Sequence, residues 1–271
     1  MGMLDGKTAI ITGSGRGIGK AAVLMMAREG ANIVVSDIDE IPAIETVEEI
    51  KKEGGVAVCC VGDVTNLDFP KKIINTALAT FGDLHIIVNN AGYTWDGMFH
   101  KMTDEQWQAM LDVHVSAPFR IIREASQYIR QKAKTEISEN KCIMRKIINV
   151  MSISGTRGSI GQINYATAKS ALSGFTKSIA REWGPLNVNC NAVSFGFILT
   201  RLAEEKEKGE MFQGKIALGI PKIMRESADV LIPLKRPGTP DEAAAGILFL
   251  ASPLSDYVTG HILHVDGGTD M

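Results

Sequence analysis

The sequence predicts an α/β protein, a single-domain Rossmann-type doubly wound parallel sheet with helices on both faces. Short β-branched runs alternate with helical patterns from Thr8 to Val265, as in proteins whose parallel strands are joined by crossover helices. The strand runs are apolar throughout, which is typical of strands buried on both faces of a sheet. A glycine-rich turn, residues 13–19, joins the first strand to the first helix.

The elements follow in chain order from the same alternation. Apolar, β-branched runs predict strands at Thr8–Thr12, Asn32–Ser36, Val56–Val61, Leu84–Asn89, Lys146–Met151, Val188–Val193 and Ile262–Val265. The patterns between them predict helices at Gly19–Glu29, Ala43–Glu53, Pro70–Phe81, Asp104–Arg130, Asn164–Trp183 and Pro240–Leu250. No linker, internal repeat or low-complexity tract interrupts the alternation, so we expect residues 1–271 to form one domain.

Two segments depart from this alternation. Residues 131–145 are polar and show no clear core stripe, so we expect a polar insertion there. Residues 201–239 begin charged and then turn apolar, with no expected strand. Because a long segment of this kind is usually a lid or a binding loop, we expect 201–239 to be a substrate loop that covers a ligand.

The composition excludes several classes of protein. The chain has 29 Lys and Arg against 31 Asp and Glu, a formal net charge of −2, so it lacks the basic excess of a nucleic-acid binder. The longest apolar run, Ala21–Ala27, is far shorter than the ~20 residues of a membrane span. The N-terminus has no signal-peptide pattern. Cys59 and Cys60 lie in an apolar run, and no cysteine has metal-ligand spacing, so we expect a cytoplasmic protein without a metal site.

The turn after the first strand has the residue types of a phosphate-binding loop. Gly13, Gly17 and Gly19 lack a Cβ, so they can take positive φ, let a pyrophosphate approach the backbone and let the helix pack on the strand. The helix N-terminus adds free N–H groups and a partial positive charge. The candidate cofactor-binding residues of this turn are Gly13, Ser14, Arg16, Gly17, Ile18 and Gly19.

Asp37 follows the second strand, where a dinucleotide-binding fold needs an acceptor for the adenosine ribose hydroxyls. A carboxylate accepts hydrogen bonds from both hydroxyls and repels a 2′-phosphate, so Asp37 favours NAD over NADP. Arg16 could pair with a 2′-phosphate, which keeps NADP open as the alternative.

Several further motifs follow one another in a fixed order. The glycine turn Thr12–Gly19 precedes the tetrad Asn89–Gly92, and a Ser…Tyr-x-x-x-Lys constellation and the segment Val265–Gly268 come later. In these motifs, over nearly its whole length, the chain resembles the short-chain dehydrogenase/reductase family. The segments 161–165 and 236–242 make it most similar to the 3-oxoacyl-[acyl-carrier-protein] reductases of that family. The resemblance also implies a homotetramer.

The resemblance implies further contacts with the cofactor. The acidic residue after the third strand and its neighbour would meet the adenine, the tetrad would border the cofactor, and a later segment would hold the nicotinamide carboxamide. The residues implied are Asp63, Val64, Asn90, Ala91, Gly92, Ile198 and Thr200, with Tyr165 and Lys169.

The constellation of Ser152, Tyr165 and Lys169 suits carbonyl chemistry. Tyr165 and Lys169 are spaced i, i+4 on a predicted helix, so their side chains share one face. A free tyrosine titrates near ~10, and we expect the lysine and an oxidised nicotinamide to lower the pKa of Tyr165 by ~2–3 units. Tyr165 would then be the general acid–base, Lys169 would hold the cofactor ribose, and Ser152 would donate a hydrogen bond to the substrate oxygen.

Two positions depart from the family's pattern. His114 stands where the family usually has an Asn that helps to bind a water linked to the lysine. Pro118 has no N–H, so the carbonyl of residue 114 loses its i+4 partner and could hold that water itself. Exchange of His114 for Asn is then expected to leave turnover within about tenfold, whereas a collapse would show that the imidazole participates. A helix histidine without a proton role is the alternative.

The second departure is Phe195, where the family usually has Pro before Gly196. We expect this aromatic side chain to reshape the pocket beside the reacting carbonyl, which bears on the substrate more than on the reaction.

The sequence leaves more than one function open. The first is an NAD-dependent reductase of 3-oxoacyl thioesters, with an acyl-carrier-protein or CoA carrier. The second is a dehydrogenase of a free small or alicyclic secondary alcohol, which the apolar half of 201–239 suits equally well. The third is a nucleotide-binding regulatory protein without catalysis. The intact Ser152, Tyr165 and Lys169 argue against it.

Overall fold

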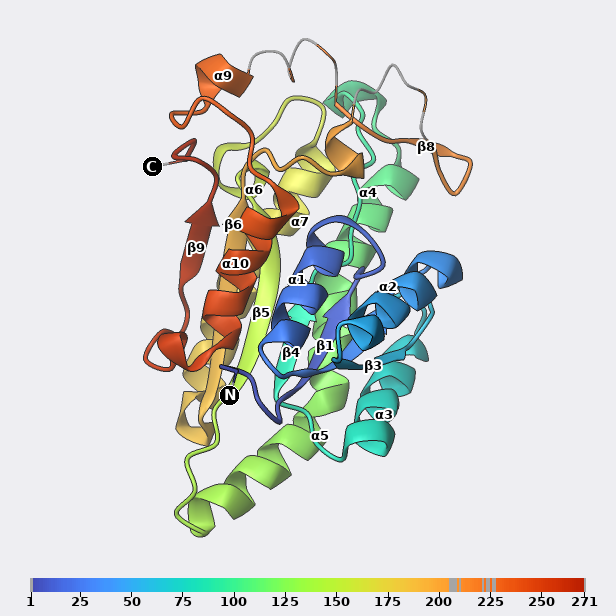
Figure 1. Ribbon diagram of the computed structural model, residues 1–271. Coiled ribbons are helices and arrows are strands. Elements are labelled where there is room, and N and C mark those ends of the chain that lie inside the picture. The colour runs from blue at the N-terminus through green and yellow to red at the C-terminus, as the bar shows by residue number, and fades with distance from the viewer. Residues whose placement is uncertain are drawn as a thin grey trace.

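Seven parallel strands form one sheet in the order β3-β2-β1-β4-β5-β6-β9 in the computed structural model (Figure 1). The structure describes residues 2–204, 209, 211–220, 222, 225 and 228–270. The strands are β1 Thr8–Thr12, β2 Asn32–Ser36, β3 Val56–Cys59, β4 Ile86–Asn89, β5 Arg145–Ser152, β6 Val188–Phe195 and β9 Ile262–Val265. The predicted α/β fold is confirmed, and three strands have the expected bounds. Strand β6 runs past its expected end because its pairing with β5 continues to Ser152 and Phe195.

Helices cover both faces of the sheet (Figure 1). They are α1 Gly17–Arg28, α2 Glu40–Lys52, α3 Phe69–Phe81, α4 Asp104–Leu111, α5 Ala117–Ser138, α6 Ser154–Arg157, α7 Ile163–Trp183, α9 Ala228–Leu231 and α10 Pro240–Ala251. Adjacent residues of β1 point to opposite faces, as in any strand. Ile11 packs with residues of α1, α2 and α10, whereas Ile10 packs with residues of α3, α5 and α7.

The long helix expected at Asp104–Arg130 is interrupted and extended. Helix α4 ends at Leu111, a π-helical turn occupies Asp112–Ser116, and α5 begins at Ala117. Pro118 lies in the first turn of α5, where a missing N–H is tolerated. A π turn also wraps the chain more widely than an α-helix, and such turns often occur at functional sites.

The segment 131–145, expected to be a polar insertion, begins as a continuation of helix α5 rather than as a loop. Helix α5 continues to Ser138, and β5 already begins at Arg145. The last turns of α5 bury Ala133 and Glu136. The sequence showed no core stripe there because one of the two buried residues is a carboxylate.

The segment 201–239 contains two short strands, contrary to the expectation of none. Met211–Phe212 (β7) and Ile216–Ala217 (β8) pair as an antiparallel hairpin. Residues 205–208, 210, 221, 223–224 and 226–227 of this expected loop lie outside the described residues. Within the part of the chain that the structure describes, no helix combines the length and apolar character needed to cross a membrane.

The strand order places the candidate residues. Strand β1 lies between β2 and β4. The chain runs from β1 through β2 and β3 toward one edge of the sheet and then crosses back to β4 on the other side of β1. In open α/β sheets, ligands bind in the crevice at such a switch point, outside the carboxyl ends of the strands. The glycine turn follows β1, Asn90 follows β4 and Ser152 ends β5.

Candidate active site

The glycine turn has the backbone that the sequence predicted at two positions. Gly13 and Gly17 have φ of +63° and +55°, in the left-handed region that favours glycine. Gly19 lies within α1 and is needed for close packing, because a Cβ there would lie 2.2 Å from the carbonyl oxygen of Gly13. Arg16 precedes α1, its side chain does not cap the helix, and the first turn holds no acidic residue. The free N–H groups of this helix end suit a phosphate.

Thr12 and Asn90 tie the turn to the end of β4. The Asn90 side-chain amide donates to the carbonyl oxygens of Thr12 and Gly13, at 2.8 and 2.9 Å. The Thr12 hydroxyl accepts hydrogen bonds from the backbone N–H groups of Asn90 and Ala91, each at 3.0 Å. The loop after β1 is therefore held before any ligand binds. Sequence reasoning gave Thr12 no role, although its place at the start of the glycine motif was a signal.

Asp37 lies beside the turn, as the sequence predicted. Its carboxylate accepts from the backbone N–H groups of Gly15, at 2.9 Å, and Asp39, at 3.1 Å. Arg16 forms an ion pair with Asp39 at 2.5 Å, and both side chains are about half exposed. The guanidinium that was considered for a 2′-phosphate thus already has a carboxylate partner.

The remaining candidate cofactor residues lie in two loops. Asp63 follows β3 and accepts hydrogen bonds from the backbone and side chain of Thr65, and Val64 beside it is buried. Ile198 is buried and forms a parallel bridge with Gly238. A Cβ on Gly17 would lie 3.5 Å from the Thr200 side chain, so the loop after β6 reaches the glycine turn.

Ser152, Tyr165 and Lys169 come together between the end of β5 and the first turns of α7. The Ser152 side chain lies close enough to the Tyr165 hydroxyl to act on its pKa. The Lys169 ammonium lies 5.6 Å from the centre of the Tyr165 ring and donates to the carbonyl oxygen of Val150 at 2.7 Å. The i, i+4 spacing therefore brings the lysine and the phenol to one face of α7, as predicted.

The direction of the Tyr165 pKa differs from the expectation. Burial raises the pKa of Tyr165 to about 12, although its hydrogen bond with Ser152 acts in the opposite direction. Burial also lowers the pKa of Lys169 to about 7. Desolvation is the largest influence on both groups, because burial disfavours their charged forms. The expected lowering depends partly on the positive charge of an oxidised nicotinamide, which the protein alone does not supply.

His114 lies next to the catalytic candidates. Its side chain is 2% exposed, and its ring meets the Tyr165 ring edge-on at 5.1 Å between centroids. Its Nε2 atom is 2.8 Å from the carbonyl oxygen of Tyr93. Burial, followed by the nearby Lys169 charge, holds the pKa of His114 well below its usual range.

The Phe195 side chain is buried in the core at the end of β6, where the residue pairs in register with Ser152. It is 5% exposed and packs in the core cluster that contains Val193 and Ile198, on the α1 and α10 face. Tyr165 packs against the cluster on the opposite face. The Phe195 side chain therefore packs in the core on the opposite face from Tyr165, and its effect on the pocket beside the reacting carbonyl stays a prediction.

One wall of the site was missed from the sequence. Fully buried Asn164 donates from its side chain to the backbone oxygens of Trp95 and Gln106, at 3.0 and 2.9 Å. Gly97 donates from its backbone to Gly161 at 2.8 Å. The loop after β4 is thus fixed along the segment that leads into Tyr165. The position of Asn164, next to Tyr165 at the start of α7, was the only signal.

The four cysteines form no disulfide bond with one another. All four are free thiols. Among the residues that the structure describes, no group of three or more His, Cys, Asp or Glu is arranged to hold a metal ion.

Comparison with known proteins identifies the family. The family model described as enoyl-(acyl carrier protein) reductase matches residues 13–270. The chain belongs to the short-chain dehydrogenase/reductase family. Among its relatives is the 3-oxoacyl-[acyl-carrier-protein] reductase FabG of Thermotoga maritima, 35% identical over 98% of both chains. The 3-oxoacyl-[acyl-carrier-protein] reductase of Synechocystis is 35% identical over 100% of both chains.

The chain is also similar to a further curated reductase and to a solved dehydrogenase structure. The short-chain reductase protein NovJ of Streptomyces niveus is 35% identical over 96% of this chain and 92% of its own. A solved 7α-hydroxysteroid dehydrogenase, in complex with NADH and 7-oxo glycochenodeoxycholic acid, superposes with a TM-score of 0.86 at 29% identity, over 98% of this chain and 94% of that one. This short-chain dehydrogenase/reductase is therefore an oxidoreductase of CH–OH groups that uses a nicotinamide cofactor.

Proposed function

We propose that this short-chain dehydrogenase/reductase is an NAD-dependent reductase of 3-oxoacyl thioesters, carried by acyl carrier protein or CoA. The observation that carries the proposal is the meeting of Ser152, Tyr165 and Lys169 at the carboxyl edge of the sheet, beside the glycine turn. Full-length relatives named 3-oxoacyl-[acyl-carrier-protein] reductase support the substrate class.

The residues present fit a nicotinamide dinucleotide. The free N–H groups at the start of α1 and the left-handed Gly13 and Gly17 suit its pyrophosphate. Asp37 suits the adenosine ribose, Asp63 and Val64 the adenine, and the loop of Ile198 and Thr200 the nicotinamide. Asn90, Ala91 and Gly92 border the same crevice.

The chain's own side chains then have separate tasks. The Ser152 hydroxyl donates to the carbonyl oxygen of the substrate as negative charge develops there. The Tyr165 hydroxyl delivers the proton to that oxygen, which is general acid catalysis in the direction of reduction. The Lys169 ammonium holds the ribose and favours the phenolate that remains. When bound, the nicotinamide supplies the hydride.

The choice of NAD is supported by charge. The Asp37 carboxylate would repel a 2′-phosphate on the adenosine ribose, because like charges repel. Arg16, the residue that could offset that repulsion, is engaged by Asp39. Both features favour a cofactor with a free 2′-hydroxyl.

The substrate is proposed to enter under the segment 201–239. The Phe212 ring of hairpin β7–β8 lies 4.6 Å from the ring of Tyr93, and Lys215 lies over the Trp95 ring at 5.0 Å. The hairpin is thus held against the loop after β4, close to Tyr165. This aromatic surface also suits the ring of a free alicyclic alcohol, which is the second candidate function.

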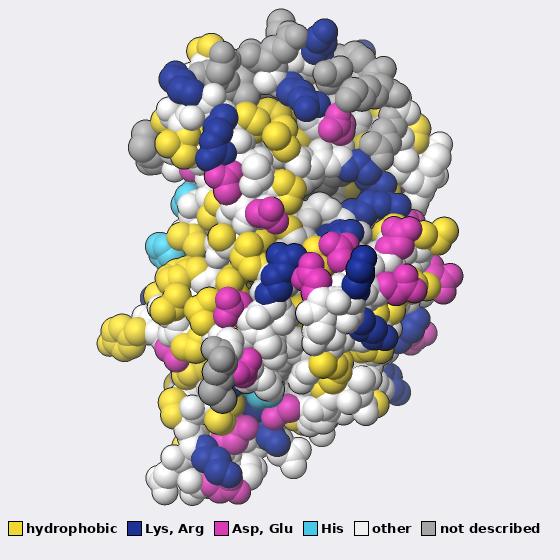
Figure 2. All heavy atoms as spheres, viewed as in Figure 1, with side chains coloured by type: hydrophobic (Ala, Val, Ile, Leu, Met, Phe, Trp, Pro, Cys, Tyr) yellow, Lys and Arg dark blue, Asp and Glu magenta, His cyan; other side chains and the backbone are white. Residues whose placement is uncertain are grey.

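We also propose that the protein is a homotetramer. Leu254 and Tyr257, just before the edge strand β9, are largely exposed, and hydrophobic side chains gather along the side formed by α10 and β9 (Figure 2). Phe119 of α5 is also exposed. Exposed apolar patches of this kind mark interaction surfaces. Sedimentation analysis tests this, and a monomer across the whole concentration range would reject it.

The deciding experiment follows the oxidation of NADH and NADPH separately, with acetoacetyl-CoA as substrate and Tyr165→Phe as control. Rapid oxidation of NADH that the variant lacks supports the proposal. Preference for NADPH keeps the reaction and overturns the cofactor choice. Turnover of cyclic ketones alone favours the second candidate, and cofactor binding without turnover of any carbonyl favours a regulatory protein.

A further inference from the structure

The buried imidazole of His114 touches both sides of the site. On one side its ring meets the Tyr165 ring edge-on, with an angle of 81° between the ring planes. On the other side its Nε2 atom lies 2.8 Å from the backbone oxygen of Tyr93. The side chain comes from the π-helical turn Asp112–Ser116, so one residue links the catalytic phenol to the loop after β4.

The hydrogen bond fixes which imidazole nitrogen carries the proton. A carbonyl oxygen only accepts, so Nε2 must donate to Tyr93. In the neutral ring, Nδ1 is then a bare acceptor, and it is buried with no hydrogen-bond partner in the part of the chain described. A neutral ring in this tautomer holds a carbonyl firmly.

The His114 ring lies so close to the backbone at position 92 that only glycine fits there. A Cβ on Gly92 would lie 2.2 Å from Cε1 and 2.8 Å from Nδ1 of His114. Contacts that short are not tolerated, so the ring occupies the volume that any other residue at 92 would need. Gly92 and His114 therefore form a matched pair.

The carbonyl that His114 holds belongs to the aromatic wall of the substrate cleft. The Tyr93 ring packs against the Phe212 ring of the β7–β8 hairpin, at 4.6 Å between centroids and with 34° between the ring planes. The contacts run from Tyr165 through His114 to Tyr93, and from there to the hairpin.

We propose that His114 is a positioning residue that sets the gap between the catalytic Tyr165 and the substrate wall at Tyr93, without moving a proton itself. This inference rests on the proposed function, because Tyr165 is catalytic only within it. His114 variants are therefore expected to raise KM and to leave unchanged the ionisations seen in the pH profile of kcat. A misplacement of about 1 Å near reacting groups can cost about a hundredfold in rate.

The matched pair gives a rescue experiment. Gly92→Ala should lower kcat/KM for acetoacetyl-CoA by at least about tenfold, because the new methyl group displaces the imidazole. His114→Asn removes the ring from that volume. The double variant should therefore recover to within about threefold of His114→Asn alone. Losses that multiply in the double variant would overturn the inference, since they would show that the two residues act independently.

A second pair of variants separates positioning from proton transfer. His114→Gln keeps a side-chain N–H that can donate to Tyr93 and should stay within about threefold of the parent enzyme, whereas His114→Leu should raise KM about tenfold. The pH profile of kcat should keep the same ionisations in both variants. A profile that loses an ionisation, or a Leu variant with unchanged KM, would contradict the inference.

Three measurements keep these outcomes distinct. Urea unfolding and NADH binding show whether each variant is folded. Turnover of the parent enzyme is recorded in the same assay, and its absence counts against the proposed function rather than against His114. When the parent enzyme is active, recovery of kcat/KM in the double variant tests the positioning role of His114.

Discussion

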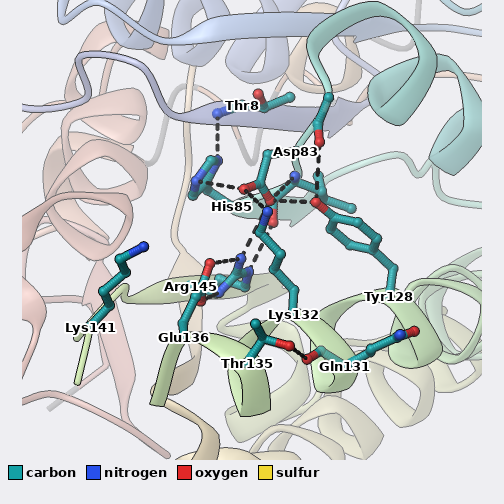
Figure 3. A network of polar contacts seen from close by, with 12 residues as sticks. Thr8, Asp83, His85, Tyr128, Gln131, Lys132, Thr135, Glu136, Lys141 and Arg145 are labelled. Atoms are coloured by element: carbon teal, nitrogen blue, oxygen red, sulfur yellow. Dashed lines mark hydrogen bonds and ion pairs between the residues drawn. The ribbon is translucent and has the colours of Figure 1, made fainter. Parts of the chain in front are cut away.

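Arg145 and Glu136 form a bidentate ion pair in the interior of the protein. The guanidinium, 1% exposed, donates to the two carboxylate oxygens at 2.6 and 3.0 Å. It also reaches the backbone oxygen of Leu84 and the carboxylate of Asp83. Figure 3 shows these groups converging where the end of α5 meets the starts of β4 and β5. The pair fixes the final turns of α5, which the sequence analysis took for an insertion.

Removal of the carboxylate from this pair should destabilise the fold. Glu136→Gln leaves the Arg145 charge buried with only partial compensation, and breaking a buried pair costs about 3–5 kcal/mol. Urea unfolding of the purified variant measures this loss, while the turnover of the folded fraction should not change. Glu139→Gln is the matched control, because Glu139 pairs with Lys141 at the surface, where water screens the pair, and it should cost far less stability than Glu136→Gln. Equal effects of the two variants would contradict this view of Arg145.

His85 should make the protein sensitive to acid. Its Nδ1 accepts the backbone N–H of Thr8 at 3.1 Å, so the ring must be neutral at that atom. Burial lowers the pKa of His85 from 6.5 to about 4, although the Asp83 carboxylate opposes the shift.

The direction in which pH changes the stability of the protein follows from proton uptake by the unfolded chain. Between pH 6.5 and about 4 the unfolded chain binds a proton at His85 that the folded protein does not, so stability falls as the pH falls. The loss amounts to roughly 3 kcal/mol. His85→Asn offers an oxygen acceptor to Thr8 without titrating, and its unfolding midpoint should change less over this range. An unchanged pH dependence would assign the acid sensitivity to other groups.

Lys169 should cost stability while serving the reaction. Burial lowers the pKa of Lys169 from 10.5 to about 7, so below pH 7 the folded protein holds a buried ammonium. Replacement by Met loses the hydrogen bond to Val150 but should still stabilise the protein by roughly 3 kcal/mol at pH 6. The gain should shrink toward pH 10.5, where the unfolded lysine also loses its proton. Thermal unfolding at pH 6 and 9.5 tests this, together with loss of turnover; a variant less stable at pH 6 would refute it.

Asp37 and Asp39 should differ in their effect on cofactor choice. Asp37→Ala removes the proposed acceptor for the ribose hydroxyls and the charge that repels a 2′-phosphate. We expect kcat/KM to fall at least about tenfold for NADH and to rise for NADPH. Asp39→Asn releases Arg16 from its ion pair and should change the NADH value by less than about threefold, with a smaller gain for NADPH. Steady-state kinetics with both cofactors tests this prediction. An unaltered ratio of kcat/KM for NADH to kcat/KM for NADPH in Asp37→Ala would exclude the proposed role of Asp37.

Much of this molecule is readable in its sequence because the informative residues act locally. The apolar runs of β1, β2 and β9 gave their bounds, and the glycine turn gave the left-handed positions Gly13 and Gly17, because each depends on neighbours within a few residues. The spacing of Tyr165 and Lys169 fixed their common face on α7. The face on which the Phe195 side chain packs was not readable, because a strand residue's face depends on the sheet around it and no local signal gives that face.

The sequence by itself determined the fold class, the helix–strand order and the identities of the serine, tyrosine and lysine, since these follow from periodicity and motif. Only the tertiary structure decided that α5 continues to Ser138, because its last turns are fixed by the distant Arg145. It alone showed that the ring of His114 fills the space left by Gly92, and that burial is the largest influence on the pKa values of Tyr165 and Lys169. Each of these depends on contacts between residues far apart in the chain, and on the water those contacts exclude.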